Sequence, residues 1–248
     1  MDNKLLAVGF HLLQKFEKLV GKYSIYGDKT FFDTRQFPWV KDIEANWMDI
    51  RKELDGVLKF RDEIPNFQDI SSDQKSITTD NKWKTFFLYG YGFKSEQNCE
   101  LCPKTAALME RIPGMKTAMF SILDGHKHIP PHRGPYKGVL RFHMGLIVPK
   151  PNTDCRIRVG NDYQSWEEGK GMVFDDTYNH EVWNDSDHQR VVLFVDFIRP
   201  LRFPVNILNK ILIFLIGISP FVQEGKKNQT KWDEKLEKKI NEVEKQLA

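Results

Sequence analysis

The sequence predicts a mainly β domain, an antiparallel sandwich or barrel, preceded by helices and followed by a helical tail. Three observations support this prediction. The middle of the chain contains short runs of aromatic and β-branched residues, and clusters of Pro, Gly, Asn and Asp separate them at regular intervals. Both ends instead repeat apolar residues at helical spacing. The length of 248 residues, 40% of them hydrophobic, suits one globular domain with a real core.

The first 80 residues are expected to form helices and a loop. Residues 5–22 place apolar side chains on one helical face, and residues 37–58 do the same over a longer stretch. Each is therefore predicted to be an amphipathic helix packed on the core. Residues 64–80 are rich in Pro, Asp, Ser and Thr, which indicates a surface loop rather than a domain linker.

The β core is expected in residues 81–200. It begins with an aromatic-rich strand at residues 83–89, which a short helix at residues 104–111 follows. Further strands are expected at residues 117–123, 139–148, 155–159, 171–174 and 191–198.

The tail, residues 201–248, has two parts. Residues 205–222 are strongly apolar but contain Asn209 and Lys210, and they are too short to cross a bilayer unaided. This part is either a buried helix or one that lies at a membrane interface. Residues 226–248 alternate Lys and Glu, which is typical of a solvated helix or a frayed tail.

Charge and composition exclude some function classes. The 37 basic and 34 acidic residues give a net charge of +3, which is too balanced to indicate a nucleic-acid-binding protein. The first residues lack the basic and small-residue pattern of a secretory signal, so we expect a cytoplasmic protein. The three cysteines fit a reducing compartment. Cys99 and Cys102 have half the spacing of a zinc site, but no second half follows, so ordinary thiols are favoured over metal or redox chemistry.

Histidines and arginines recur in the β region where neither would help a hydrophobic core. Strand alternation places Arg141 and His143 on one face of residues 139–148 and the apolar residues on the other. A polar face enclosed by a barrel needs a ligand. Two imidazoles on separate β elements could coordinate a transition metal, and nearby arginines could hold a dicarboxylate; the candidates are His132, His180, Arg141 and Arg190.

Each candidate also has a simpler interpretation. His132 follows two prolines and could sit in a rigid turn, and His180 could belong to a surface loop. Arg190 could be a surface residue of its strand. His126 and His128 lie in a Gly-containing stretch and are interpreted as loop residues. Only the candidates taken together favour a site.

Several motifs, in order, resemble the catalytic domain of the aspartyl/asparaginyl β-hydroxylases. The resemblance covers roughly residues 83–200. It rests on the runs Phe120-Ser121-Ile122-Leu123, His132-Arg133-Gly134-Pro135, residues 140–149 (LRFHMGLIVP), residues 155–158 (CRIR), residues 165–170 (SWEEGK), Phe174-Asp175-Asp176, His180-Glu181-Val182-Trp183 and Arg190.

The resemblance implies a double-stranded β-helix of the jelly-roll or cupin-like type, and an oxygenase that uses Fe(II), 2-oxoglutarate and O2. His132 and His180 are then the two iron ligands. The residues implied for 2-oxoglutarate are Arg190 and Ser121 at its distal carboxylate, and Arg141 and His143 at the end that chelates iron.

Gly134 occupies the position where most oxygenases of this superfamily carry a carboxylate ligand. The resemblance therefore implies iron held by two protein ligands only, as in the aspartyl/asparaginyl hydroxylase branch. Asp175 and Asp176 could orient an iron-bound water or a ligand histidine, or they could simply cap a turn.

The substrate is either peptidyl Asp/Asn or the acyl chain of a membrane lipid. Residues 83–90 and 128–138 look most like the bacterial lipid A and ornithine-lipid hydroxylases, which favours the lipid. The segment from Ile207 to Ile218 could lie among lipid headgroups at the inner face of the cytoplasmic membrane, or it could pack on the sheet or form a dimer interface. A third interpretation, a catalytically inactive β-sandwich binding module, is disfavoured by the intact set of histidines and arginines.

Overall fold

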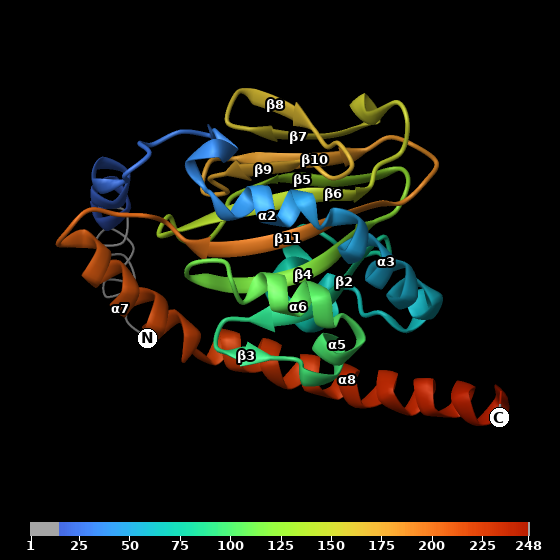
Figure 1. The fold of residues 1–248 in the computed structure, drawn as a ribbon. Coiled ribbons are helices and arrows are strands. Elements are labelled where there is room, and N and C mark those ends of the chain that lie inside the picture. The colour runs from blue at the N-terminus through green and yellow to red at the C-terminus, as the bar shows by residue number, and fades with distance from the viewer. Residues whose placement is uncertain (1–14, 248) are drawn as a thin grey trace.

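The computed structural model describes residues 15–247 and contains two antiparallel sheets packed face to face. The major sheet has the strand order β1-β9-β6-β11-β4-β2-β3, and the minor sheet has the order β5-β10-β7-β8 (Figure 1). This arrangement is the predicted double-stranded β-helix. The strands of the major sheet are β1 (Phe31–Phe32), β2 (Trp83–Gly90), β3 (Phe93–Lys94), β4 (Met115–Leu123), β6 (Val139–Ile147), β9 (Gly171–Phe174) and β11 (Arg190–Ile198).

The minor sheet contains two strands that the sequence analysis missed and that matter for the site, β5 and β10. The sequence of β5 includes two adjacent prolines, which a central strand excludes because proline has no N–H to donate. β5 lies at the sheet edge, where this loss is tolerated, and its register with β10 shifts beside the prolines. The minor-sheet strands are β5 (Lys127–His132), β7 (Cys155–Val159), β8 (Asp162–Ser165) and β10 (His180–Asn184).

Short helices cover the outer face of the major sheet (Figure 1). Their apolar residues join those of β2, β4, β6 and β11 in one core, which also contains the buried thiols of Cys99 and Cys102. Burial raises the pKa of both thiols. The helices α2 and α3 thus brace the outer face of the barrel. The helices are α2 (Trp39–Ala45), α3 (Trp47–Val57), α5 (Glu96–Leu101) and α6 (Pro103–Met109), with the 3₁₀ turns η1 (Thr34–Gln36) and η2 (Leu58–Glu63). The 3₁₀ turn η4 (Asn152–Asp154) instead adjoins β7 and β8 of the minor sheet.

One of the helix predictions for the N-terminal region needs correction. The single helix expected over residues 37–58 is broken at Asn46, whose backbone leaves the helical region and whose side-chain amide donates to the Asp42 carbonyl at 2.8 Å. This bond offers the backbone an alternative to the helical pattern. Of the helix expected over residues 5–22, residues 15–23 are helical and the rest lies outside the described residues.

The loop expected over residues 64–80 is also wrong in part. It contains the helical turns α4 (Phe67–Ile70) and η3 (Ser72–Ser76). Ile70 is buried in the core of the inner face, the face that the two sheets turn toward each other. This segment therefore forms a wall of the barrel interior.

Two helices, α7 (Val205–Gly217) and α8 (Pro220–Leu247), form the C-terminal part of the fold. The charged tail is not frayed within the described residues, because α8 is continuous and buries Val222 and Leu236. α7 lies against the fold through Val205, Asn209 and Ile213, one residue per turn. Asn209 is an anchor rather than an interruption, since its amide donates to the Gly138 carbonyl at 2.9 Å.

The membrane-spanning potential of these helices is limited. Within the described residues, no single helix is long and apolar enough to cross a bilayer. α7 and the first part of α8 reach the required length and apolarity only as a pair, and the pair is bent by 52°.

Candidate active site

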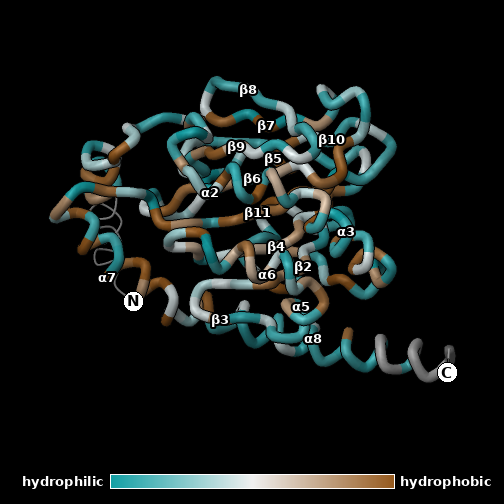
Figure 2. Tube along the Cα trace, in the orientation of Figure 1, coloured by the Kyte–Doolittle hydropathy of each residue, from teal (hydrophilic) through white to brown (hydrophobic). Residues whose placement is uncertain are grey.

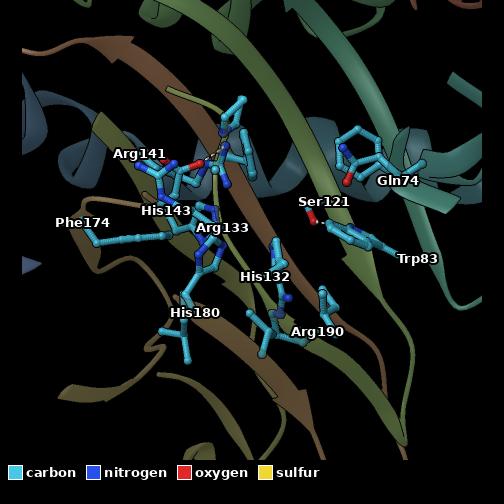
Figure 3. A pocket seen from close by; sticks show the side chains of 18 residues that line it. Gln74, Trp83, Ser121, His132, Arg133, Arg141, His143, Phe174, His180 and Arg190 are labelled. Atoms are coloured by element: carbon cyan, nitrogen blue, oxygen red, sulfur yellow. Dashed lines mark hydrogen bonds and ion pairs between the residues drawn. The ribbon is translucent and has the colours of Figure 1, made fainter. Parts of the chain in front are cut away.

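His132 and His180 lie side by side at the mouth of the barrel. His132 ends β5 and His180 begins β10, and the two residues are direct partners in the antiparallel register. Their ring centroids are 4.0 Å apart, and both rings belong to one pocket (Figure 3). The fold therefore brings together the two histidines that the sequence singled out as candidate metal ligands.

Backbone hydrogen bonds fix the tautomer of both imidazoles. His132 Nδ1 donates to the Pro130 carbonyl at 2.8 Å, and His180 Nδ1 donates to the Tyr178 carbonyl at 3.0 Å. Because a carbonyl oxygen only accepts, each Nδ1 carries the proton and each Nε2 keeps its lone pair. Burial lowers the pKa of His132, and burial and then the neighbouring His132 lower the pKa of His180 to about 3. Both rings are thus neutral, as metal ligands must be.

Within residues 15–247, no third candidate metal ligand joins these two histidines. Among the described residues, no cluster of three or more His, Cys, Asp or Glu side chains is arranged to hold a metal ion. A Cβ atom built on Gly134 would lie 2.2 Å from the Asp176 carboxylate, so the space for a side chain at this position is already filled. The Gly134 N–H also donates to the Asp176 carbonyl at 2.8 Å.

Arg190 is a buried cation with no anionic partner among the described residues. It is 2% exposed, its Nε and Nη1 have no hydrogen-bonding partner, and it forms no ion pair there. Its guanidinium lies 4.5 Å from the centroid of the Trp166 ring. Burial lowers the pKa of Arg190 to about 10, so the group is still charged at neutral pH. An unpaired buried charge is costly, so the chemistry of this end of the pocket suits an anionic ligand.

Ser121 lines the same end of the pocket from β4. Its Oγ accepts a hydrogen bond of 3.0 Å from Trp83 Nε1, and the hydroxyl proton remains available to donate. Figure 3 shows this bond on one side of the pocket and the two histidines nearer its centre.

Arg141, in contrast, already has two carboxylate partners. Its Nη2 lies 2.9 Å from Asp176, and its Nε donates to Asp196 at 2.9 Å. Asp196 is its cross-strand partner on β11. Burial alone would lower the pKa of Arg141, but Asp176 and Asp196 raise it. Among the described residues its Nη1 has no hydrogen-bonding partner, so one edge of the guanidinium remains for a ligand.

His143 follows Arg141 by two residues on β6, and both point into the pocket, as strand alternation predicted. Neither ring nitrogen of His143 has a partner within the described part of the chain. Burial, followed by the charge of Arg141, holds its pKa well below the usual range. The neutral ring therefore offers one donor and one acceptor to a ligand.

The adjacent aspartates Asp175 and Asp176 have different surroundings. Asp176 lines the pocket, and burial raises its pKa to about 6. Asp175 does not line the pocket; it lies beside Lys137 and Arg199 and accepts from the Thr177 N–H at 3.0 Å. The geometry therefore leaves Asp176 as the aspartate that lines the pocket, and makes Asp175 part of a turn and an ion-pair cluster.

Of the two histidines interpreted as loop residues, His126 and His128, only His128 needs correction. His128 lies in β5 rather than in a loop, but its ring faces outward, stacks on Trp183 and lies 3.0 Å from Glu181. His126 does lie between strands, where it pairs with Asp187 at the surface. Neither contributes to the pocket lining.

The pocket has a volume of about 110 Å³ and is lined by several residues that the sequence analysis did not name. Trp83 and Phe174 were assigned to strands without a role, and Phe194 was hidden in the apolar run of β11. Strand alternation was the available signal, because these side chains point to the same inward face of the major sheet as Ser121, Arg141 and His143. Gln74 and Phe67 come from the segment predicted to be a surface loop.

The donor set fits a ferrous ion and an anionic cosubstrate. Two neutral imidazoles suit a first-row transition metal. The unpartnered atoms of Arg190 and His143, together with the Ser121 hydroxyl, suit carboxylate and carbonyl oxygens.

Comparisons with known proteins agree with this arrangement. The family model described as aspartyl/asparaginyl β-hydroxylase matches residues 44–200. The chain is 52% identical to the ornithine lipid ester-linked acyl 2-hydroxylase of Rhizobium tropici over 220 residues, which are 89% of this chain and 78% of that protein. It is 35% identical over 170 residues to human aspartyl/asparaginyl β-hydroxylase, but it spans 22% of that longer protein.

Among solved structures, the fold is similar to a Cupin 2 conserved barrel domain protein from Salinispora arenicola. The TM-score is 0.32, the sequence identity is 8%, and the match covers 56% of this chain and 92% of that one. The extent of the family match, and the presence of its motifs around one pocket, lead to the assignment. The chain belongs to the aspartyl/asparaginyl β-hydroxylase family of enzymes.

Proposed function

We propose that this protein is an Fe(II)- and 2-oxoglutarate-dependent dioxygenase that hydroxylates an unactivated C–H bond in the acyl chain of a membrane lipid. The observation that supports it most strongly is Arg190, a fully buried guanidinium without an anionic partner among the described residues. A folded protein tolerates such a group when a ligand supplies the missing charge. A dicarboxylate is the ligand class that fits.

The two histidines would hold Fe(II) through Nε2, with Nδ1 of each ring fixed by a backbone carbonyl. Iron, 2-oxoglutarate and O2 together supply the oxidising chemistry that a C–H bond of this kind requires. The Asp176 carboxylate would accept a hydrogen bond from water in the position that Gly134 leaves without a ligand.

The remaining polar residues would position the cosubstrate. Arg190 and Ser121 would bind the distal carboxylate by charge-assisted hydrogen bonds. His143 and the free edge of Arg141 would bind the opposite end. Because Arg141 is itself held by two carboxylates, its guanidinium is positioned before the ligand arrives, which lowers the entropy lost on binding.

A lipid substrate is supported by the relative that is 52% identical, whose name is ornithine lipid ester-linked acyl 2-hydroxylase. It is also supported by the apolar, exposed side of α7, which no described residue covers. We therefore propose peripheral contact with the inner face of the cytoplasmic membrane. The alternative substrate, peptidyl Asp or Asn, is supported by the lower identity to the human enzyme.

The test is oxygen incorporation with defined substrates. The purified chain, Fe(II), ascorbate and 2-oxoglutarate are incubated with vesicles that contain ornithine lipids, and separately with an Asp/Asn-containing peptide. Mass spectrometry then detects the gain of one oxygen atom, and succinate is measured in the same sample. We expect oxygen in the lipid acyl chain and an equal amount of succinate.

The matched control is His132→Ala, which removes one Nε2 and should abolish both signals. Oxygen found in the peptide and not in the lipid would show that the substrate is peptidyl Asp or Asn. Absence of succinate with either substrate at any iron concentration would favour a binding module without catalysis.

A further inference from the structure

A second cavity lies next to the active-site pocket and shares a wall with it. It has a volume of about 180 Å³ and is bounded by β2, β4 and β11 on one side and by the start of α8 on the other. The residues that line both spaces are Phe67, Gln74, Pro135, Arg141 and Phe194. The two cavities are therefore neighbours along the inner face of the major sheet.

The second cavity is mainly apolar. The charged residues in its lining, Arg141 and Asp196, are paired with each other at 2.9 Å, so they offer no unpaired charge to a ligand. A water molecule occupies roughly 30 Å³, so a cavity of this volume is large enough for several carbon atoms. Its apolar walls are formed by Ile70, Phe87, Phe93, Met119, Phe221 and Val222.

The outer end of this cavity opens onto an exposed apolar face. Phe221 lines the cavity and is itself 43% exposed. Figure 2 shows the hydrophobic stretches of α7 and of the start of α8 beside the body of the fold. The exposed apolar face, as we call it, consists of Phe203, Ile207, Leu208, Ile211, Phe214, Leu215, Ile218 and Phe221.

The charge around this face is positive. Residues 201–227 contain four basic side chains and one acidic one, Glu224. The basic ones, all exposed, are Arg202, Lys210, Lys226 and Lys227. Exposed apolar residues with basic neighbours are typical of surfaces that bind anionic bilayers.

We propose that the second cavity is an acyl groove, through which a lipid acyl chain passes from a bilayer docked on the exposed apolar face to the two histidines. The inference rests on the proposed function, because it assigns a path to that substrate. The shared walls lead from the groove to the metal site, so one carbon of the chain can lie at the histidines while the remainder of the chain occupies the groove.

Gly225 supports this assignment. It lies inside α8, where glycine is a poor helix former, and it lines the groove. A Cβ at this position would meet only the Ile70 carbonyl oxygen, at 3.8 Å. The backbone therefore does not require glycine here. The absence of a side chain leaves space in the groove.

The first test uses photolabelling, which does not depend on catalysis. The full chain is mixed with vesicles of phosphatidylcholine and phosphatidylglycerol that contain a phosphatidylcholine with a diazirine at the end of one acyl chain. After illumination, labelled peptides are mapped by mass spectrometry. We expect label on groove residues such as Met119 and Phe93, and we expect Gly225→Leu, which fills the groove, to lower it by about tenfold.

Two variants control for folding and for added bulk. Gly225→Ala should label like the wild type, and so should Gly56→Leu, because a Cβ at Gly56 meets no atom within 4 Å and lies on α3. Label confined to other cavities, or equal labelling of the groove in Gly225→Leu, would overturn the proposal. A wild type that labels in the groove but hydroxylates no lipid would refute the proposed function and leave the groove standing.

The second test concerns the docking surface. Each basic residue near an anionic bilayer contributes about 1 kcal/mol, so Lys226→Gln with Lys227→Gln should weaken vesicle binding by about 30-fold. The matched control is Lys238→Gln with Lys239→Gln, which removes the same charge further along α8 and should leave binding unchanged. Equal weakening in both pairs, or in neither, would overturn this docking surface.

Discussion

Two buried arginines line one pocket, and their surroundings differ completely. Arg141 lies between Asp176 and Asp196, each 2.9 Å away, whereas Arg190 has no acidic partner among the described residues and lies over Trp166. Both are largely removed from water. The difference shows that one guanidinium is part of the folded framework, whereas under the proposed function the other takes its counter-charge from 2-oxoglutarate.

Under the proposed function, this contrast would let the pocket bind a dianion and keep its structure in the absence of that dianion. The Arg141 end remains neutralised by its own carboxylates, so it stays ordered when empty. At the Arg190 end the guanidinium has no carboxylate partner among the described residues, so its charge would contribute to the affinity for an anionic ligand and not to folding stability. The same residue type thus serves stability at one end and affinity at the other.

The largest effect is expected from Arg141→Met. The substitution leaves two buried carboxylates without their cation, and breaking a buried pair in this way costs about 3–5 kcal/mol. We expect the free energy of unfolding to fall by that amount, measured by urea denaturation of the chain without iron or 2-oxoglutarate.

The double variant Arg141→Met with Asp196→Asn tests the cause. Removing one of the two stranded carboxylates should recover part of the lost stability, because the two sites are direct cross-strand partners. The opposite outcome is additivity. If Asp196→Asn lowers the free energy of unfolding equally in the wild type and in Arg141→Met, the two residues do not stabilise each other.

The next effect is expected from Arg190→Met, which should lower the affinity for 2-oxoglutarate and not the stability of the fold. Removing an unpaired buried charge should leave the free energy of unfolding within about 1 kcal/mol of the wild type, or raise it. The affinity for 2-oxoglutarate should fall by about 30- to 1,000-fold, because about 2–4 kcal/mol of charge-assisted hydrogen bonding is lost. Anaerobic calorimetry with the metal-loaded chain measures the affinity.

Arg190→Lys provides the control for charge alone. It keeps the cation but loses the planar fork, so it should recover only part of the affinity. A strong loss of stability in Arg190→Met, with 2-oxoglutarate affinity unchanged, would reverse the assignment of the two arginines.

The same contrast marks what the sequence could and could not predict. The inward-facing polar set on β6 followed from alternation, because the apolar residues of that strand pack on the outer core. Both metal-ligand candidates lie on strands that the pattern missed. β5 carries two prolines that only an edge strand tolerates, and β10 is five residues long and flanked by turn residues. Their roles came from the family resemblance rather than from periodicity.

Partners contributed by distant strands were beyond sequence reasoning. Asp196 stands in an apolar run, and only its register opposite Arg141 gives it a purpose. Asn209 was counted only as an interruption of the apolar run, yet it fixes α7 by a hydrogen bond to Gly138. A polar residue inside an apolar run is therefore better interpreted as a sign of an unseen partner than as evidence against burial.

The smallest effect is expected from Ser121→Ala, which probes the Arg190 end more finely. Ser121 accepts from Trp83 Nε1 at 3.0 Å and can donate its proton to a carboxylate. Losing one such donor costs about 1 kcal/mol, so the KM for 2-oxoglutarate should rise about fivefold, far less than in Arg190→Met. Trp83→Phe is the matched variant, because it removes the indole N–H but leaves the serine hydroxyl in place. It should change the KM less than Ser121→Ala does; a larger rise in Trp83→Phe would mean that the indole, not the hydroxyl, positions the ligand.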